Sequence, residues 1–315
     1  MTLLSRTAEN LYWLSRYMER ADSLARTLEA AFRLSSLPAT YGGRATEWES
    51  AVVSCGCADA FRATFAEATP QNVVDFVAFS PANPSSIRRC FEIARSNARA
   101  ERTALTSEMW DTINSTYHEL QGWGSRPLSL SDLPRFVAFV KEVSLRFDGS
   151  ADRTMLRNDA FWFTRLGLYL ERADNTARIL DVKYHVLLPA NAQVGGSLDY
   201  YQWASILRSV SALTSYRWVY RDSIKPWLVS DLLILRDEMP RSLASCYANI
   251  TNYLDEIADA YGRQGVSQRS ARAMRARLRN ATIDGIFQSG LHEFVGSFIA
   301  ANNQVGMAIA EQYLQ

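Results

Sequence analysis

Hydrophobic residues recur every three to four positions along most of the chain, which is the period of an α-helix. The clearest cases are residues 7–35 and 158–187, where apolar side chains form a heptad-like stripe beside a polar one. Asn83-Pro84 predicts a helix start, with Asn as the N-cap and Pro at the first helical position. Since no segment shows a convincing strand-like alternation, the sequence predicts an all-α protein. Further helices are predicted at residues 45–60, 84–103, 105–120, 130–150, 198–222, 240–260, 266–282 and 285–313.

The two longest helical segments are also related to each other in sequence. Residues 17–29 align without gaps to residues 169–181, with eight of thirteen positions identical, and both contain Tyr-x-Glu-Arg-Ala-Asp. Weaker matches follow in the same order farther along the chain, which predicts a tandem duplication. We expect one repeat over 1–150 and a second over 151–315. Each would be a helical-bundle half, and the two would pack around a shared or pseudo-twofold core.

Composition and charge narrow the possible functions. The chain has 315 residues, 48% of them hydrophobic, which is enough for one large core or two ordinary domains. The net charge of +1 creates no overall field that would attract nucleic acid or an anionic membrane. No stretch approaches the roughly 18 apolar residues of a transmembrane helix, and Met1 to Leu14 lacks the apolar run of a signal peptide. We therefore expect a cytoplasmic protein that binds neither nucleic acid nor membranes.

Cysteine and histidine give little support for a metal or cofactor. Of the four cysteines, Cys55 and Cys57 are separated by one residue, whereas zinc ligands usually have two or more between them. We interpret all four as small, buried apolar residues. The three histidines are scattered, and none stands in a Glu-x-x-His spacing. The sequence therefore predicts no metal and no cofactor.

The duplicated motif places charged residues beside the apolar stripe. At about 100° per residue, Glu19, Asp22 and Arg26 fall on one polar stripe of the first helix. Arg20 falls on the opposite side, because neighbours in sequence diverge around a helix. The expected neighbours are therefore Asp22 with Arg26, at i and i+4. The second half repeats this arrangement with Glu171, Arg172, Asp174 and Arg178.

Three interpretations fit a charged centre in which the two stripes meet between the halves. The first is a salt-bridge network that sets how the halves pack. The second is a pocket for a zwitterionic or peptide-like ligand, in which Arg holds a carboxylate and Glu an ammonium group. The third is a carboxylate-bridged metal, which the missing Glu-x-x-His disfavours. Separately, Arg95 and Arg99 share one face of another predicted helix. This face could bind an anion, or it could be a solvated face whose arginines pair with nearby acidic residues.

These residues resemble the bacterial alpha-E proteins, a family of helical proteins named for a conserved Glu-Arg motif. The resemblance spans essentially the whole chain and implies that Glu19, Arg20, Glu171 and Arg172 are active or binding residues. The matching segments are Asn10-Leu-Tyr-Trp13 leading into Arg16-Tyr-Met-Glu-Arg-Ala-Asp22, Asn83-Pro-Ser-Ser-Ile87, Ala94-Arg95 with Asn97-Ala-Arg99, Ser107-Glu-Met-Trp110, and Leu168-Tyr-Leu-Glu-Arg-Ala-Asp174.

The resemblance also implies a functional context. Members are typically encoded beside, or fused to, a circularly permuted ATP-grasp ligase, often with a transglutaminase-like protease. We therefore expect a partner of an ATP-grasp amide ligase that binds a peptide or amino-acid ligand during synthesis or modification of a small peptide or amide-linked metabolite. One alternative is an enzyme that uses Glu19 or Glu171 in acid-base catalysis on an amide or activated carboxylate. The other is a non-catalytic helical scaffold.

Overall fold

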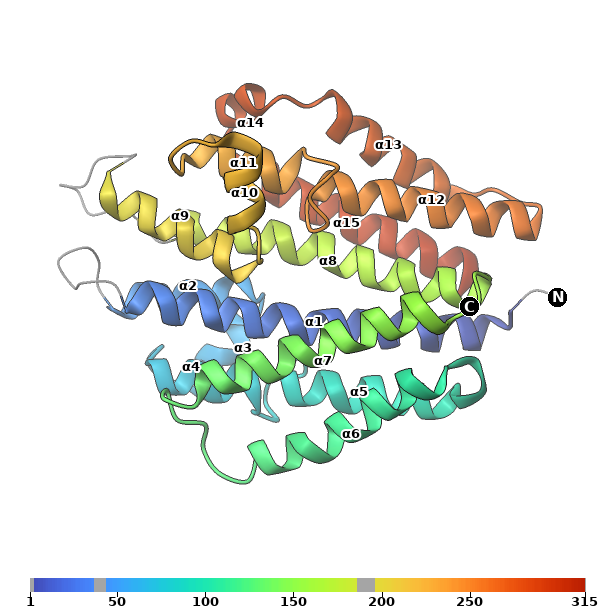
Figure 1. The fold of residues 1–315 in the computed structure, drawn as a ribbon, viewed down its shortest axis with the longest axis horizontal. Coiled ribbons are helices and arrows are strands. Elements are labelled where there is room, and N and C mark those ends of the chain that lie inside the picture. Colours follow the sequence, from blue (N-terminus) through green and yellow to red (C-terminus); the bar gives the residue numbers. More distant parts are fainter. Residues whose placement is uncertain (1–2, 37–43, 186–195, 315) are drawn as a thin grey trace.

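The computed structural model describes residues 3–36, 44–185 and 196–314 (Figure 1). Within these ranges the chain forms fifteen α-helices and one short 3-10 helix, and no strand, so the predicted all-α class is confirmed. None of the helices in the described ranges combines the length and the apolar composition needed to cross a membrane.

The helices follow one another with short connections. The first part of the chain contains α1 Ser5–Ser35, α2 Arg44–Ser54, α3 Ala58–Thr64, α4 Pro70–Ala78, α5 Ile87–Ala100, the 3-10 helix Arg102–Ala104, α6 Ser107–Trp123 and α7 Leu133–Thr154. The second part contains α8 Asp159–His185, α9 Ser197–Ser209, α10 Leu213–Tyr220, α11 Pro226–Ile234, α12 Leu243–Tyr261, α13 Val266–Asn280, α14 Ile283–Ser289 and α15 Leu291–Tyr313.

The two longest helices, α1 and α8, run parallel and side by side through the middle of the molecule (Figure 1). At one end of the pair, the backbone N–H of Leu3 donates a 2.9 Å hydrogen bond to Asp159. Gly167 permits the close approach, since a Cβ there would lie 2.1 Å from the carbonyl oxygen of Tyr12. Because the helices are parallel, their Glu-Arg motifs lie at the same level.

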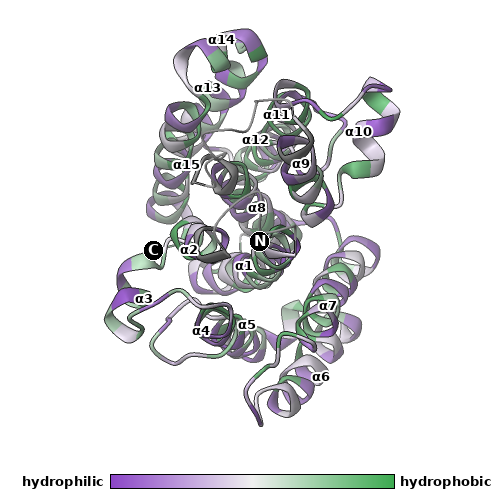
Figure 2. Ribbon diagram, turned by 90° about the vertical axis from the view of Figure 1, so that its left-hand side faces the viewer, coloured by the Kyte–Doolittle hydropathy of each residue, from purple (hydrophilic) through white to green (hydrophobic). Residues whose placement is uncertain are grey.

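The other helices surround this central pair (Figure 2). Helices α4 to α7 lie on the α1 side, and α11 to α15 on the α8 side, while α2 and α9 each contact both α1 and α8. The buried hydrophobic residues form two clusters, one on each side, and Leu3, Trp162 and Tyr253 pack against both. As a result α1 is enclosed on most sides, and more than half of its residues are buried.

Most of the predicted helices are present, but three of them are interrupted. Each is interrupted at a residue with a positive φ angle, a conformation that L-residues rarely adopt and that ends a helix. These residues are Gly56 (68°), Ser211 (59°) and Gly290 (93°). They divide the segments predicted as single helices at residues 45–60, 198–222 and 285–313. Helices α4 and α11 have no predicted counterpart.

The predicted helix start at Asn83-Pro84 is wrong by three residues. Helix α5 begins at Ile87, and Ser86 is its N-cap, since its hydroxyl accepts from a backbone N–H of the first turn. Asn83 instead shapes the preceding turn: its side chain accepts the N–H of Ser85 at 3.0 Å.

The same local arrangement recurs before α12. Ser242 is its N-cap, as Ser86 is for α5. The residue before each N-cap, and directly after a proline, is Ser85 in the first part and Arg241 in the second. The tandem duplication and the boundary at 150 stay predictions from the sequence, although α7 continues past that boundary to Thr154.

Candidate charged centre and adjoining cavity

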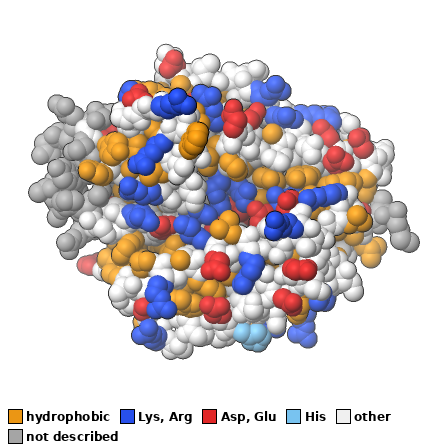
Figure 3. Space-filling model, viewed as in Figure 1, with side chains coloured by type: hydrophobic (Ala, Val, Ile, Leu, Met, Phe, Trp, Pro, Cys, Tyr) orange, Lys and Arg blue, Asp and Glu red, His pale blue; other side chains and the backbone are white. Residues whose placement is uncertain are grey.

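The two motif glutamates bind the arginines of each other's helix. Arg172 donates two hydrogen bonds to Glu19, of 3.1 and 2.9 Å, and Arg20 donates two to Glu171, of 2.6 and 3.1 Å. Both glutamates are at most 2% exposed. Figure 3 shows acidic and basic side chains gathered near the middle of the molecule, where α8 runs beside α1. Each Glu-Arg pair is therefore completed by the other helix.

This geometry corrects the position expected for Arg20. The helical wheel placed Arg20 on the side opposite the polar stripe, but its guanidinium reaches Glu171 on the neighbouring helix. A wheel assumes that one face of a helix is buried and the other solvated. Helix α1 is enclosed on most sides, so the side on which Arg20 lies is occupied by protein as well.

A second arginine joins each glutamate, and neither of these two arginines was among the predicted site residues. Arg241 donates to Glu19 at 2.8 Å and to Asp22 at 2.7 Å. Arg16 donates to Glu171 at 2.8 Å. Arg16 lies one turn before Glu19 on the same helix, within a segment that carries the resemblance, so a signal for it was present. No sequence pattern points to Arg241, because it reaches the centre from the turn before α12.

The arginines determine the protonation of both glutamates. Burial alone would raise the pKa of Glu19, but Arg172 and Arg241 outweigh burial and lower it to about 2. Burial likewise opposes ionisation of Glu171, whereas Arg16 and Arg20 lower its pKa to about 2. Both carboxylates are therefore ionised at neutral pH.

The aspartates of the motif show the i, i+4 pairs expected from the wheel. Asp22 accepts from Arg26 Nε at 2.6 Å, and Asp174 accepts from Arg178 Nε at 2.6 Å. Each arginine also reaches the last residue of a helix in the other part of the chain. Arg26 donates to the carbonyl of Ser209 at 2.7 Å, and the Arg178 contact to α2 is longer, at 3.5 Å. These arginines cap carbonyl groups that helix ends leave unpaired.

A cavity of about 200 Å³ adjoins the charged centre on the side of Glu171. Asp174 Oδ1, Asn175 Nδ2 and Ser54 Oγ are buried there without a hydrogen-bond partner. Burial raises the pKa of Asp174 more than Arg178 lowers it. The lining residues are Arg20, Ser23, Leu24, Thr27, Ser54, Cys55, Gly56, Ser85, Glu171, Asp174, Asn175 and Arg178.

The cysteines only partly match the expectation that all four are buried. Cys90 and Cys246 are buried, whereas Cys55 and Cys57 are half-buried at the end of α2. Among the residues that the structure describes, no three His, Cys, Asp or Glu side chains are grouped so that they could hold a metal ion. The carboxylates of the charged centre face arginines instead.

Arg95 and Arg99 lie apart from the charged centre. Arg95 donates to Asn114 at 3.1 Å, and its guanidinium lies 4.4 Å from the ring centroid of Tyr117. Arg99 is exposed. Neither residue lines the cavity. An anion-binding role for this pair stays a prediction.

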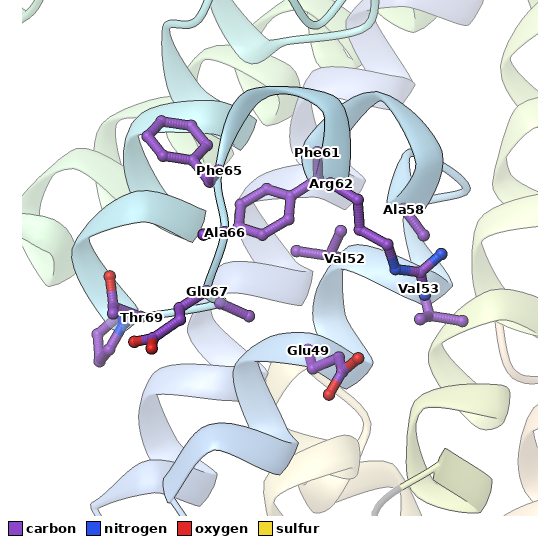
Figure 4. A pocket seen from close by; sticks show the side chains of 12 residues that line it. Glu49, Val52, Val53, Ala58, Phe61, Arg62, Phe65, Ala66, Glu67 and Thr69 are labelled. Atoms are coloured by element: carbon purple, nitrogen blue, oxygen red, sulfur yellow. The ribbon is translucent and has the colours of Figure 1, made fainter.

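A second, larger cavity of about 610 Å³ lies between α2, α3 and the start of α4 (Figure 4). Its lining is mainly apolar, with Val52, Phe61 and Phe65. The charged residues of the lining are Glu49, Arg62 and Glu67. None of the motif residues lines it. Of the residues predicted for binding, Arg20, Glu171, Asp174 and Arg178 line the smaller, polar cavity.

Comparisons with known proteins identify the family. No curated protein and no solved structure matches this chain. A family model matches residues 3–314, and it is described as a predicted alpha-helical domain with a conserved ER motif. That motif corresponds to the Glu-Arg pairs at Glu19 and Glu171, whose reciprocal contacts join α1 to α8. The chain therefore belongs to the Alpha-E family.

Proposed function

We propose that this chain is a cytoplasmic, ligand-binding partner of an ATP-grasp amide ligase. It holds an amino acid or peptide in the cavity beside Glu171 and Asp174, for the synthesis or modification of a small peptide or amide-linked metabolite. The observation that carries the proposal is the set of buried polar atoms without partners in that cavity. Burying such atoms is costly unless they are hydrogen-bonded, and a polar ligand supplies the missing partners.

The charges around the cavity suit a zwitterion. Glu171 and Asp174 provide carboxylates for a positively charged group. Arg178, whose side chain is 31% exposed, provides a guanidinium for a carboxylate. Charge-assisted hydrogen bonds of this kind are about twice as strong as neutral ones.

The protonation of the glutamates favours binding over acid-base catalysis. An efficient general base has a pKa near the working pH. Glu19 and Glu171, with pKa values of about 2, are weak bases, and arginines occupy them. The closed contacts of Glu19 favour a structural role for that side of the centre. We therefore assign support of the fold to Glu19 and ligand binding to the side of Glu171.

The proposal is tested by co-purifying the chain with its ATP-grasp protein and measuring ATP turnover on amino acids with and without the chain. We expect turnover, or the identity of the product, to depend on the chain. Asp174→Asn should abolish this effect while the complex persists. Asp152→Asn is the matched control, because Asp152 is exposed and pairs with Arg157 outside the cavity. A transglutaminase-like protease is the second proposed partner, and the same co-purification detects it.

Two results would contradict the proposal. If the ligase neither binds the chain nor needs it, the partnership is wrong. If the ligase needs the chain but Asp174→Asn behaves like wild type, the scaffold alternative is favoured and the cavity has no part in the reaction.

A further inference from the structure

We infer that the cavity binds the guanidinium group of an arginine-like ligand, in the position that the side chain of Arg241 occupies on the other side of the charged centre. This inference rests on the proposed ligand-binding function and names the chemical class of the ligand.

Arg241 shows how a guanidinium completes such a site. Its Nη1 donates to Glu19 Oε1 at 2.8 Å, and its Nη2 donates to Asp22 Oδ2 at 2.7 Å. Each of these oxygens also accepts from the Nε of another arginine, Arg172 or Arg26. The fixed fork of a guanidinium thus bridges two carboxylates that lie one turn apart on α1.

The matching oxygens beside the cavity each have one donor fewer. Glu171 Oε1 accepts from Arg20 Nε at 2.6 Å, and Asp174 Oδ2 accepts from Arg178 Nε at 2.6 Å. From the described residues, neither oxygen receives the second donor that Arg241 gives to its counterpart. Arg16 binds the other oxygen of Glu171, Oε2, and so leaves this position open.

Ser85 explains why the position is open. It precedes the N-cap of α5 as Arg241 precedes the N-cap of α12, and it lines the cavity. A serine is too short to reach Glu171 and Asp174, so the volume that a guanidinium and its stem would fill remains as the cavity. Oδ1 of Asp22 has no hydrogen-bond partner, and the same is true of Oδ1 of Asp174, so the two sides do not differ in this atom. They differ in the bridging guanidinium, which is present beside Glu19 and missing beside Glu171.

The surrounding charges indicate that the ligand also carries a carboxylate. The four charged residues that line the cavity, two acids and two arginines, sum to zero, and Arg16 adds one positive charge behind Glu171. A ligand with only a cation would increase this excess. Arginine, free or at the C-terminus of a peptide, also provides a carboxylate, and the partly exposed guanidinium of Arg178 can bind it.

The test is calorimetric titration of the full-length chain with L-arginine, L-citrulline and L-alanine. Citrulline has nearly the shape of arginine but carries a neutral urea group, and alanine is a zwitterion without a cationic side chain. We expect arginine to bind with a stoichiometry of one. Citrulline should bind roughly tenfold more weakly or worse, which is the loss expected when a charged donor to a carboxylate becomes neutral.

Variants of Ser85 supply the matched control. Ser85→Arg should place a guanidinium in the cavity from within the chain, abolish binding of arginine and raise the melting temperature. Ser85→Met also fills the cavity but brings no charge, so it should block binding without the same gain in melting temperature. Retention of the α-helical circular dichroism spectrum confirms that either variant is folded.

Each other outcome overturns the inference. If citrulline binds as tightly as arginine, or Ser85→Arg still binds arginine as wild type does, the guanidinium does not occupy this position. If alanine binds as well as arginine and Ser85→Arg abolishes both, the guanidinium inference fails and the proposed function survives. If none of the three binds, the inference fails, and the assay of ATP turnover decides the proposed function independently.

Discussion

Replacing Glu19 by Gln tests whether the charged centre stabilises the fold. Glutamine has nearly the same size as glutamate but is neutral, and its amide N–H groups cannot accept hydrogen bonds. In Glu19→Gln, the guanidinium groups of Arg172 and Arg241 therefore lose the charge that they share. Both side chains are at most 13% exposed, so water cannot fully replace that charge.

Two estimates of the loss agree. The pKa of Glu19 falls from 4.5 in the unfolded chain to about 2. At 1.36 kcal/mol per pKa unit, that shift corresponds to roughly 3 kcal/mol of stabilisation at neutral pH. Removing one partner of a buried ion pair typically costs about 3–5 kcal/mol. We therefore expect Glu19→Gln to lower the free energy of unfolding by about 3 kcal/mol.

Equilibrium unfolding in urea, followed by circular dichroism, measures this loss as a shift in the midpoint at an unchanged slope. The control is Glu92→Gln, because Glu92 pairs with Arg89 across 3.2 Å at the surface. Exposed pairs of this kind contribute about 0–1 kcal/mol. This prediction is refuted if Glu19→Gln lowers the free energy of unfolding by no more than Glu92→Gln does. The charge of Glu19 would then not be needed to neutralise the buried arginines.

Three further predictions concern the same central helices. Gly167→Ala should cost about 1–3 kcal/mol by overpacking, because its Cβ would lie 2.1 Å from a backbone oxygen of α1. Gly149→Ala, whose Cβ meets nothing within 4 Å, should instead stabilise by about 0.5–1 kcal/mol, and urea unfolding compares the two. Glu19 and Glu171 have lowered pKa values, so their stabilisation is complete above pH 4.5 and is lost as the pH falls towards about 2. When unfolding is measured at several pH values, the free energy of unfolding should decrease less towards acid pH for Glu19→Gln than for wild type. Asn302→Ala should cost about 1–3 kcal/mol in a thermal melt, because it leaves a buried tyrosine hydroxyl on α12 without its partner and removes the second donor to a carbonyl on α8.

The long helices could be predicted because their apolar pattern extends over many turns. Helices α1 and α8 were expected at residues 7–35 and 158–187 and are found at Ser5–Ser35 and Asp159–His185. The nine-residue helices α4 and α11 were missed, since so few residues show little more than two turns of a period. Interruptions such as that at Ser211 were missed because a serine gives no warning of a positive φ angle.

The candidate site was predicted in composition but not in connectivity. The motif identified Glu19, Glu171 and their aspartates as one charged group, and in the structure each glutamate binds the motif arginine of the other helix. The wheel excluded Arg20 because it describes an isolated helix with one solvated side. Arg241 is distant in sequence and belongs to no periodic pattern, so only the fold brings it to Glu19.

The reciprocal pairing of α1 and α8 also sets the order in which the chain can fold. Glu19 finds Arg172 at a separation of 153 residues and Arg241 at 222. At about 5–20 residues per second, a ribosome needs about 8–30 s to reach the first of these partners. During that interval the nascent α1 carries a hydrated, unpaired carboxylate on what will become an interior surface. The reciprocal contact between α1 and α8 therefore waits until residue 172 has been made, and a chain stopped before that residue leaves Glu19 without Arg172 and Arg241.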